Sequence, residues 1–433
     1  MKPPPISARW RHGQIKNIAD VTLGKMLQSS NSGDDIEANY MRAANVQPEG
    51  VLQLDPKLMW FKPGELESLS LRQGDVVVVE GGVGGYGRAA YVPADLQGWG
   101  FQNSINRLRP VGENDGRFLT YYLIALRASG FIERYCNVVS MPHLTAEKLA
   151  AIPIPIPEVI EQRAIANFLD RETARIDTLI EEQQRLIDLL LDRRQSIIET
   201  TVFTGLDGGE TKDPTEPWLP TLPVNWTTTQ LGFVSDTTAG WAFPSDGFTQ
   251  VESDVRLLRG VNVKPGGTDW SDMMRWNQSD NAVPDIYQLI PGDLVLGMDR
   301  PFVGGGVRIA VLTTDDVPSL LVQRVMRIRP SAVADPGYFR YILESSAFWA
   351  YLEPLFTGVS VPHVSEWQVR KFRMPLPPLV EQRRIAAHIE EKTTKIDLLV
   401  AEAERFVELA SERRTALITA AVTGQIDVRD EVA

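Results

Sequence analysis

The sequence predicts a mixed α/β (α+β) protein that is a tandem duplication, each copy being a globular domain followed by one long helix. Three observations carry this prediction. The second half of the chain repeats the first at an offset of about 220 residues. Short β-branched runs alternate with glycine and proline early in each copy. Each copy ends in a long stretch without glycine or proline, in which apolar residues recur at steps of three and four.

The repeat is clearest where each long helix is expected to begin. The segment from Met141 reads MPHLTAEKLAAIPIPIPEVIEQRAIANFLDRETARIDTLI, and the segment from Val361 reads VPHVSEWQVRKFRMPLPPLVEQRRIAAHIEEKTTKIDLLV. Proline, histidine, Glu-Gln-Arg and Ile-Asp recur in register. Upstream the match is weaker but continuous, and it places Arg42, Asn45 and Arg88 opposite Arg259, Asn262 and Arg308.

This pattern divides the chain into five parts. Residues 1–150 and 225–370 are the two globular domains, and residues 151–206 and 371–433 hold the two long helices. Residues 207–224 form a linker, because the segment beginning at Asp207 is rich in glycine, proline and acidic residues and has no apolar core of its own.

A ladder of prolines precedes each helix, and fixed φ angles with missing N–H groups favour an extended edge there. The helices are then expected from about Val159 to Val202 and from about Leu379 to Val422, each about 65 Å long at ~1.5 Å per residue. Their narrow apolar stripes predict that the two helices pack on each other as an antiparallel coiled coil, which would set the distance between the domains. The alternative is two amphipathic helices that pack on their own domains. The expected stripes are Ile165, Leu169, Ile176, Leu179, Leu186, Leu190 and Ile197, and Ile385, Ile389, Ile396, Leu399, Phe406 and Leu417.

The composition excludes several classes of protein. The chain has 44 Lys and Arg against 56 Asp and Glu, a net charge of −12, so any DNA binding must be local rather than a general coating of phosphate. The one cysteine, Cys136, excludes an internal disulfide, and the four histidines lack the spacing of a metal site. No stretch approaches the roughly 20 apolar residues of a membrane span, so we expect a cytoplasmic protein that does not enter a membrane.

One motif suggests a cofactor loop but has the wrong context. Residues 82–87 fit G-x-G-x-x-G after the predicted strand 76–80, yet a returning strand follows where a helix should begin. The second copy replaces this loop and keeps the flanking strands and Arg308. We interpret the motif as a glycine-rich hairpin. His143 and His363 follow prolines at equivalent points, and a loop-bracing role is favoured over metal ligation.

The sequence also lacks the motifs of the enzymes that act on DNA. It has no G-x-x-x-x-G-K-[ST] phosphate loop and no Asn-Pro-Pro or Asp-Pro-Pro followed by an aromatic residue, and Pro284-Asp285 has no nuclease Glu-x-Lys nearby. We therefore expect no catalytic residue, no cofactor and no metal in this chain.

These residues resemble the specificity subunits of type I restriction-modification enzymes, and the resemblance covers essentially the whole chain. Its marks are Glu161-Gln162-Arg163, Ile165 and Ile176-Asp177, with copies at Glu381-Gln382-Arg383, Ile385 and Ile396-Asp397, and the Thr-Gly ends of both helices. The resemblance implies two target-recognition domains, each reading one half of an interrupted double-stranded DNA target. It also implies that the helices dock two DNA-methyltransferase (modification) subunits, which would bind S-adenosylmethionine and methylate adenine, and that ATP-driven translocation and cleavage belong to restriction subunits.

The duplication sorts candidate DNA contacts, because the halves of such a target usually differ. Residues shared by both copies should serve the scaffold or contact phosphate, and loop residues that differ should read bases. We assign phosphate contact to Arg88 and Arg308. Weaker candidates, for which a scaffold role is equally open, are Arg42 with Asn45 and Arg259 with Asn262. Base reading is assigned to the loops around Tyr86 and around Arg300 with Phe302, where Arg300 would pair with guanine.

Two other interpretations stay open. A protein-interaction scaffold, with two α/β modules spaced by a coiled coil, would fit the acidic charge. A specificity arm of a modification-only enzyme has the same sequence features as one from a full restriction system. Neither the DNA target nor its spacer length follows from the sequence.

Overall fold

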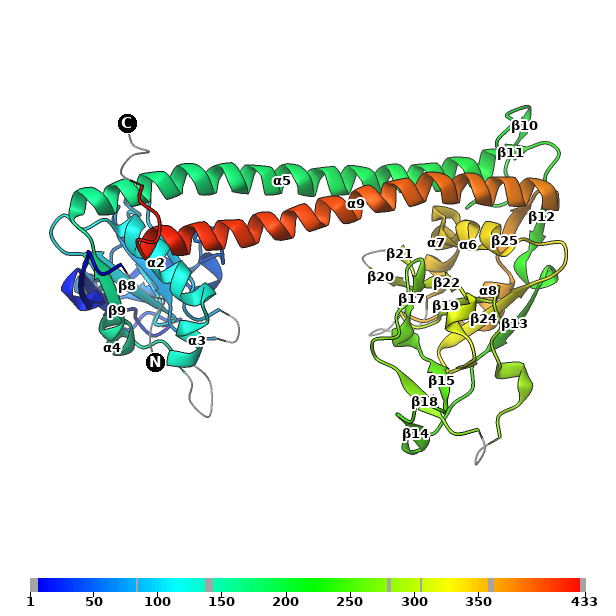
Figure 1. Cartoon of the computed structure of the whole chain (residues 1–433), viewed down its shortest axis with the longest axis horizontal. Helices are drawn as coiled ribbons and strands as arrows, with labels where there is room; N and C mark the ends of the chain where they lie inside the picture. The colour runs from blue at the N-terminus through cyan, green and yellow to red at the C-terminus, as the bar shows by residue number, and fades with distance from the viewer. Residues whose placement is uncertain are drawn as a thin grey trace. The chain divides into compact units, whose positions relative to one another are not determined.

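The computed structural model describes residues 7–82, 85–136, 143–278, 282–303, 306–356 and 362–428 (Figure 1). Its contacts divide the chain into two compact units. The first unit combines Met1–Arg185 with Ala403–Ala433, and the second unit is Leu186–Glu402. Each long helix therefore contributes one segment to each unit.

The first unit is built on two small sheets. An antiparallel sheet has the order β2-β8-β5-β6, and a second sheet has the order β4-β3-β7. The predicted hairpin is confirmed, because Val76 pairs with Tyr91 and no helix follows the glycine-rich segment. The strands are β2 Ala19–Leu23, β3 Ile36–Met41, β4 Leu58–Phe61, β5 Val76–Val79, β6 Ala89–Tyr91, β7 Trp99–Phe101 and β8 Ile105–Pro110.

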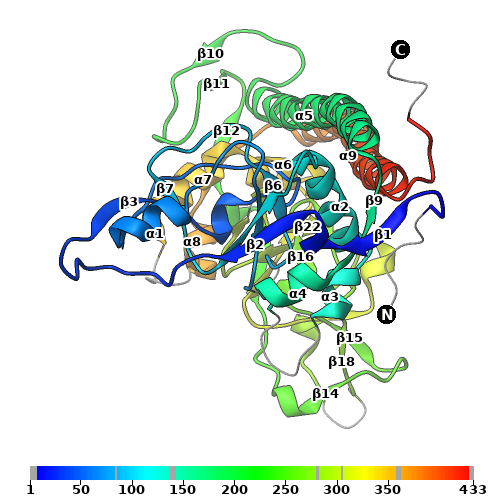
Figure 2. The ribbon, with the colours of Figure 1, turned by 90° about the vertical axis from the view of Figure 1, so that its left-hand side faces the viewer.

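Short helices and an extended pair complete the first unit (Figure 2). The first proline ladder forms strand β9, which pairs antiparallel with β1, so the predicted extended edge is confirmed. All four residues of β5 are buried, which puts this strand at the centre of the packing. The remaining elements are β1 Arg11–Gln14, α1 Pro63–Ser68, α2 Gly116–Ala128, α3 Phe131–Tyr135, α4 Ala146–Ala151 and β9 Pro153–Ile156.

The second unit repeats this topology. Its main sheet has the order β13-β24-β19-β22, which matches β2-β8-β5-β6 position by position, and β12 pairs with β25 as β1 pairs with β9. Its main elements are β12 Thr227–Gln230, β13 Ser235–Ala239, β15 Val255–Leu258, β18 Met274–Trp276, β19 Leu294–Gly297, β22 Ile309–Val311, β23 Ser319–Leu321, β24 Val325–Pro330, α6 Pro336–Glu344, α7 Ser346–Leu352, α8 Glu366–Arg370 and β25 Arg373–Leu376. Two-residue strands are β10 Thr211–Lys212, β11 Leu222–Pro223, β14 Phe248–Thr249, β16 Val263–Lys264, β17 Gly267–Thr268, β20 Phe302–Val303 and β21 Gly306–Val307. The predicted duplication is thus present in the fold.

The two long helices lie where the sequence placed them. Helix α5 spans Val159–Thr204 and α9 spans Leu379–Val422. In the first unit the beginning of α5 packs with the end of α9, and Arg414 Nε lies 2.8 Å from Asp177 Oδ1. In the second unit the end of α5 packs with the beginning of α9, and Arg194 Nε lies 2.9 Å from Asp397 Oδ1. The segments are therefore antiparallel within each unit, as predicted.

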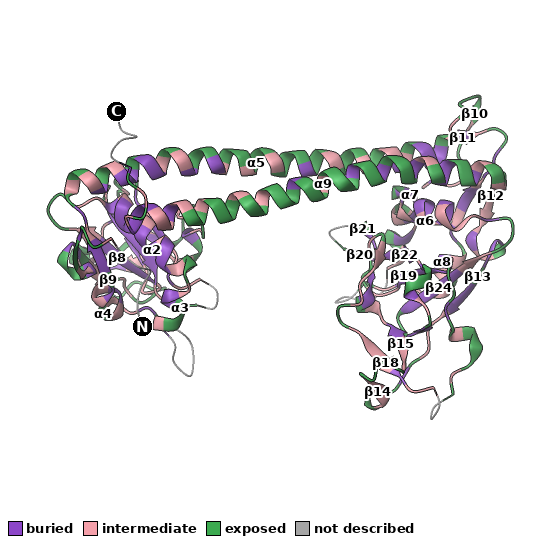
Figure 3. Cartoon of the chain, viewed as in Figure 1, coloured by how far each residue is buried: buried purple, intermediate pink, exposed green. Residues whose placement is uncertain are grey.

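The buried stripe of these helices differs from the predicted one. On α5 it recurs every eleven residues, at Ile165, Ile176, Ile187 and Ile198, which are 1%, 8%, 5% and 0% exposed. On α9 the same spacing joins Ile385, Ile396, half-buried Val407 and Ile418. An eleven-residue repeat is three turns of about 3.67 residues, so it suits helices without the left-handed supercoil of a heptad seam. The predicted seam is wrong at Leu179, Leu186, Leu399 and Phe406, which are 44%, 43%, 50% and 41% exposed. Figure 3 shows exposed residues along much of both long helices.

Candidate nucleic-acid interface

A buried ion pair fixes the central strands of each unit. Arg109 Nε and Nη2 donate to both carboxylate oxygens of Asp75 at 2.7 Å, and Arg329 holds Asp293 in the same way at 2.6 and 2.8 Å. Both aspartates are at most 1% exposed. The hydrogen bonds that the arginines donate to these carboxylates raise the pKa of both guanidinium groups, which therefore stay charged. These shared residues belong to the scaffold.

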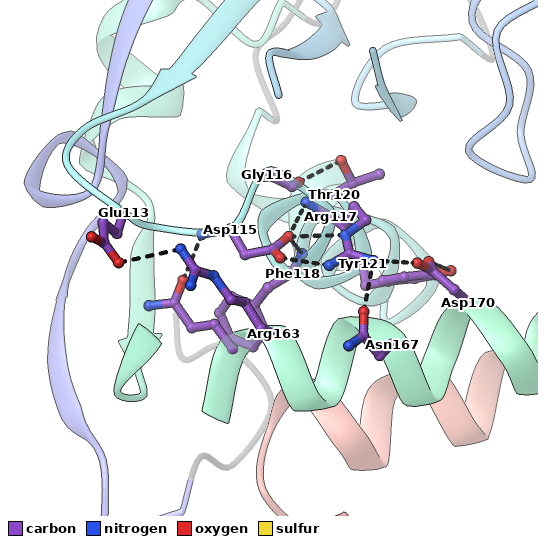
Figure 4. Close-up of polar contacts among 11 residues, drawn as sticks. Glu113, Asp115, Gly116, Arg117, Phe118, Thr120, Tyr121, Arg163, Asn167 and Asp170 are labelled. Atoms are coloured by element: carbon purple, nitrogen blue, oxygen red, sulfur yellow. Dashed lines mark hydrogen bonds and ion pairs between the residues drawn. The ribbon is translucent and has the colours of Figure 1, made fainter. Parts of the chain in front are cut away.

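A second set of contacts holds the globular part of the first unit on α5 (Figure 4). Asp115 caps α2 by accepting hydrogen bonds from the backbone N–H groups of Arg117 and Phe118. Arg117 reaches across to α5, where Nη1 donates to Asp170 at 2.7 Å and to Asn167 at 2.9 Å. These contacts orient the domain on its helix.

An equivalent tyrosine strengthens this attachment in each unit. The Tyr121 hydroxyl donates to Asp170 at 2.8 Å, and the Tyr341 hydroxyl donates to Glu390 of α9. Burial is the main cause that raises the pKa of both hydroxyls, which therefore keep their protons and remain donors. These contacts thus hold the globular part of each unit on a long helix.

The candidate interface itself lies in the loops after β5 and β19. In both units a residue just after the strand accepts a backbone hydrogen bond from the segment that precedes the long helix. Leu144 N donates to Glu80 O at 2.7 Å, and Val364 N donates to Met298 O at 3.0 Å. The next residues form β-bridges, Gly81 with His143 and Asp299 with His363. The two predicted histidines therefore pair with these loops through their backbones. A side chain at Gly81 would lie 2.6 Å from the His143 ring, so glycine is required there.

The first unit presents Tyr86 and Arg88 after this bridge. Both side chains are half-buried, and the burial of Tyr86 raises the pKa of its hydroxyl. Arg88 lines a cavity of about 580 Å³ together with Arg127 and Arg414. The loop residues Val83 and Gly84 of the predicted hairpin lie outside the described residues. Phosphate contact by Arg88 and base reading by Tyr86 stay predictions.

Arg308 occupies the equivalent position in the second unit, and its side chain donates hydrogen bonds to two backbone carbonyls. Its Nε donates to Val263 O at 3.0 Å, and its Nη1 donates to Asp299 O at 2.8 Å. Burial lowers the pKa of this guanidinium. The side chain thus braces the loop that carries Arg300, and a phosphate contact remains a prediction. The glycines at 304 and 305 lie outside the described residues.

Arg300 and Phe302 lie in the same loop but in different environments. Arg300 is exposed, and its backbone has a left-handed φ of 45°. Phe302 is half-buried because its ring packs against Trp349, with the ring centroids 4.0 Å apart. The loop therefore brings Arg300, Phe302 and Arg308 together, and Arg300 is the one whose side chain is fully available to a ligand.

The four strand-end candidates form two matching turns. Asn45 and Asn262 are 0% exposed, and each Oδ1 accepts a hydrogen bond from the backbone N–H of its preceding arginine, at 2.9 and 3.1 Å. Their amide nitrogens donate to backbone carbonyls as well. Arg42 is ion-paired with Asp55, and Arg259 Nη2 lies 2.9 Å from Asp272 Oδ1. The buried asparagines fit the scaffold role that the sequence left open.

One exposed cation at this interface was not singled out from the sequence. Arg324, in the turn between β23 and β24, is 60% exposed and has a left-handed φ of 69°. Its Nη1 lies 3.5 Å from Asp299 Oδ1, beside Arg300. The 220-residue repeat places Arg324 opposite Ser104. Because loop residues that differ between the copies are candidates for base reading, this difference could have identified Arg324 from the sequence.

The described residues contain neither a candidate metal site nor a helix that could span a membrane. No group of His, Cys, Asp or Glu in the described ranges has the arrangement of a metal site. In the same part of the chain, no helix combines the length and the apolar character needed to cross a membrane.

Two α/β modules of one topology, each with a differing loop on a shared scaffold, define a two-module recognition protein. Residues 8–188 match the family model of the type I restriction modification DNA specificity domain. The MjaVIII specificity subunit of Methanocaldococcus jannaschii is 27% identical over 72% of this chain and 70% of that protein. The EcoAI specificity subunit of Escherichia coli is 33% identical over 39% of this chain and 28% of that protein. The chain is thus similar to the specificity subunits of type I restriction enzymes, and residues 8–188 match their DNA specificity domain.

Solved structures share the fold over nearly the whole chain. A chain from a study of complex assembly and conformational transition of the type I R-M system has a TM-score of 0.69 and 18% identity, covering 98% of this chain and 100% of its own. The HsdS subunit from Thermoanaerobacter tengcongensis has a TM-score of 0.50 and 20% identity, with the same coverage. The tandem architecture is therefore the architecture of these proteins.

Proposed function

We propose that this chain is the DNA-specificity subunit of a type I restriction-modification complex. The first unit reads one half of an interrupted double-stranded target, and the second unit reads the other half. Partner subunits supply the chemistry: two modification subunits bind S-adenosylmethionine and methylate adenine, and restriction subunits use ATP to translocate and cleave. The chain itself is non-catalytic and directs these activities to one sequence.

One observation supports this proposal more than any other. The two units keep the same buried ion pairs, Asp75 with Arg109 and Asp293 with Arg329, on the same sheet topology. The loops that this scaffold carries have different residues, around Tyr86 in one unit and around Arg300 in the other. A shared scaffold with unlike exposed loops suits the reading of two unlike half-sites.

The acidic composition is compatible with this function. At a net charge of −12 the chain alone has little general attraction for phosphate. The partner subunits that surround the duplex would supply most of the phosphate contacts. We therefore expect weak DNA binding by the isolated chain and strong, sequence-dependent binding by the complex.

The test is to purify the chain alone and in complex with its modification subunits, and to map the methylated adenines in genomic DNA by modified-base sequencing. The complex should methylate adenines at two unlike short sequences separated by a fixed gap, while the chain alone should show no methyltransferase, ATPase or nuclease activity. Methyl transfer by the pure chain would contradict the non-catalytic role. A complex without a sequence preference would favour the protein-interaction scaffold, and cleavage assays with a restriction subunit would separate a full system from a modification-only enzyme.

A further inference from the structure

Two exposed arginines of the second unit have a backbone conformation that residues other than glycine rarely adopt. Arg300 has a φ of 45° and Arg324 a φ of 69°, and they are the non-glycine residues with a positive φ among the described residues. A left-handed backbone costs free energy for any residue with a Cβ, and such residues cluster where function requires them. The strain at Arg300 and Arg324 therefore suggests that their side chains have a function.

The first unit shows that the loop does not need arginine at either place. Backbone hydrogen bonds align the two loops: Glu80 N donates to Ser104 O, and Met298 N donates to Arg324 O, both at 2.9 Å. By this alignment, and by the bridges of Gly81 and Asp299, Gly82 corresponds to Arg300. Gly82 has a φ of 108°, so the common loop geometry calls for glycine there. The second unit places an arginine in the same left-handed position.

Asp299 precedes Arg300 in the chain and contacts Arg324, and its own backbone is held by Arg308. Its backbone carbonyl accepts a hydrogen bond from Arg308 Nη1 at 2.8 Å, and its carboxylate Oδ1 lies 3.5 Å from Arg324 Nη1. This contact occupies one edge of the Arg324 guanidinium. Its other N–H groups make no hydrogen bond within the described residues, and neither does the side chain of Arg300. The loop therefore presents two guanidinium groups, one of them held by a carboxylate.

We propose that Arg324 reads a guanine of the second half-site together with Arg300, and that Asp299 is the positioning residue for Arg324. This inference rests on the proposed function and deepens it. A phosphate can bind a cation from many directions, so a contact with phosphate does not require the arginine to be held in a strained backbone conformation. Guanine O6 and N7 instead require two N–H groups in one plane, which a guanidinium of fixed direction provides. Ser104 and Gly82 offer no such group, so the first half-site is read differently.

The experiment uses the assembled complex and three variants, two at Arg324 and one at Arg300. Arg324→Gly removes the guanidinium and the strain together. It should raise the unfolding temperature by about 1–4 °C and reduce discrimination at one base pair of the second half-site by about 5- to 150-fold. Arg324→Lys keeps the charge and the strained backbone but lacks the fork, so it should lose the same discrimination with the salt dependence of binding unchanged. Arg300→Gly, which installs the residue found at position 82, should do the same at a neighbouring base pair.

Asp299→Ala tests the positioning role. It removes a negative charge, so the salt dependence of binding should not decrease, while the preference governed by Arg324 should weaken. The matched control is Arg72→Ala, which removes one exposed positive charge from the first unit and should leave the second half-site unchanged. Target preference is measured by modified-base sequencing and by salt titration of duplex binding.

The outcomes separate this inference from the proposed function. If Arg324→Gly weakens binding to all sequences equally and lowers the salt slope by about one unit, Arg324 contacts phosphate and the inference is wrong. If the variants keep the wild-type target and discrimination, the inference is also wrong, although the proposed function stands. A wild-type complex that methylates without any sequence preference would instead contradict the proposed function.

Discussion

The side chain of Gln162, in the first turn of α5, accepts a hydrogen bond from the backbone N–H of Asp115 at 3.0 Å. The same contact recurs between Gln382 and Asp335 at 2.9 Å. Each glutamine is fully buried, and its amide nitrogen donates to a proline carbonyl five residues earlier, at 3.0 and 2.8 Å. The central residue of the repeated Glu-Gln-Arg segment thus joins the start of each long helix to the cap of a domain helix.

Replacing Gln162 with leucine should lower the free energy of unfolding by about 1–3 kcal/mol, because the Asp115 N–H and the Pro157 carbonyl lose a buried partner. Calorimetry or urea unfolding of the whole chain measures this. The control is Gln184→Leu on the exposed face of α5, expected to change stability by less than about 0.5 kcal/mol. Equal effects of the two substitutions would contradict the role assigned to Gln162.

Asp316 should make the second unit sensitive to acid. Burial raises the pKa of this carboxyl, but hydrogen bonds from Thr268, Thr313 and Trp270 outweigh burial and hold the pKa below its usual value. A depressed folded pKa contributes stability that is fully present above the unfolded pKa of about 3.9 and is lost as the pH falls through the folded value.

Asp316→Asn should therefore flatten the pH dependence of unfolding below about pH 4. It should also destabilise the chain near neutral pH by about 1.5–3 kcal/mol, because an amide cannot accept the same set of hydrogen bonds. The control is Asp315→Asn, an exposed neighbour whose side chain makes no hydrogen bond within the described residues. An unchanged acid profile in Asp316→Asn would show that this contribution is absent.

Arg88 and Arg308 should behave as phosphate contacts. Replacement of either by alanine is expected to weaken the binding of the complex to every sequence about equally and to lower the salt slope by about one unit. Filter binding or anisotropy at several salt concentrations measures both quantities. For Arg308, weaker binding with an unchanged slope would assign the residue to bracing Asp299 instead, and an altered base preference would assign either residue to readout.

The length of the long helices should set the gap between the half-sites. Inserting eleven residues near Gln183 and near Ala403 keeps the buried stripe in phase and adds about 16 Å of rise. At about 3.4 Å per base pair, the preferred spacer should lengthen by about five base pairs. Insertions of two residues are the control, because they turn the stripe by about 200° and should disrupt the pairing. An eleven-residue variant that assembles and uses the original spacer would exclude the helices as the ruler.

Local signals in the sequence were sufficient for the large elements. The absence of glycine and proline defined both long helices to within two residues, and the repeat predicted the matching topology of the two units. The hairpin after β5 followed from its flanking strands rather than from the G-x-G-x-x-G spelling. The helices and the hairpin depend on residues that are close together in the chain, and the shared topology followed from the repeat.

Features that depend on distant contacts were not predictable in the same way. The step pattern of α5 predicted Leu186 as an inward position, whereas the structure buries its neighbour Ile187 and leaves Leu186 exposed. The environment of Arg308 depends on the carbonyl of Val263, 45 residues earlier in the chain. The left-handed backbone of Arg324 has no signature in residue type, because glycine is the usual residue there.

The most direct test of the account is to exchange one recognition module for the other. The two ends of each module are joined by equivalent backbone hydrogen bonds: Ile15 N donates to Ile152 O at 3.0 Å, and Leu231 N donates to Phe372 O at 2.9 Å. Because the ends of each module are adjacent, residues 231–372 can be replaced by residues 15–152. The measurement is modified-base sequencing of DNA methylated by the complex that contains this chimera. Because the helix segments are antiparallel in each unit, we expect a symmetric target in which the first half-site appears twice, inverted. An assembled chimera that still methylates the original asymmetric target would contradict it.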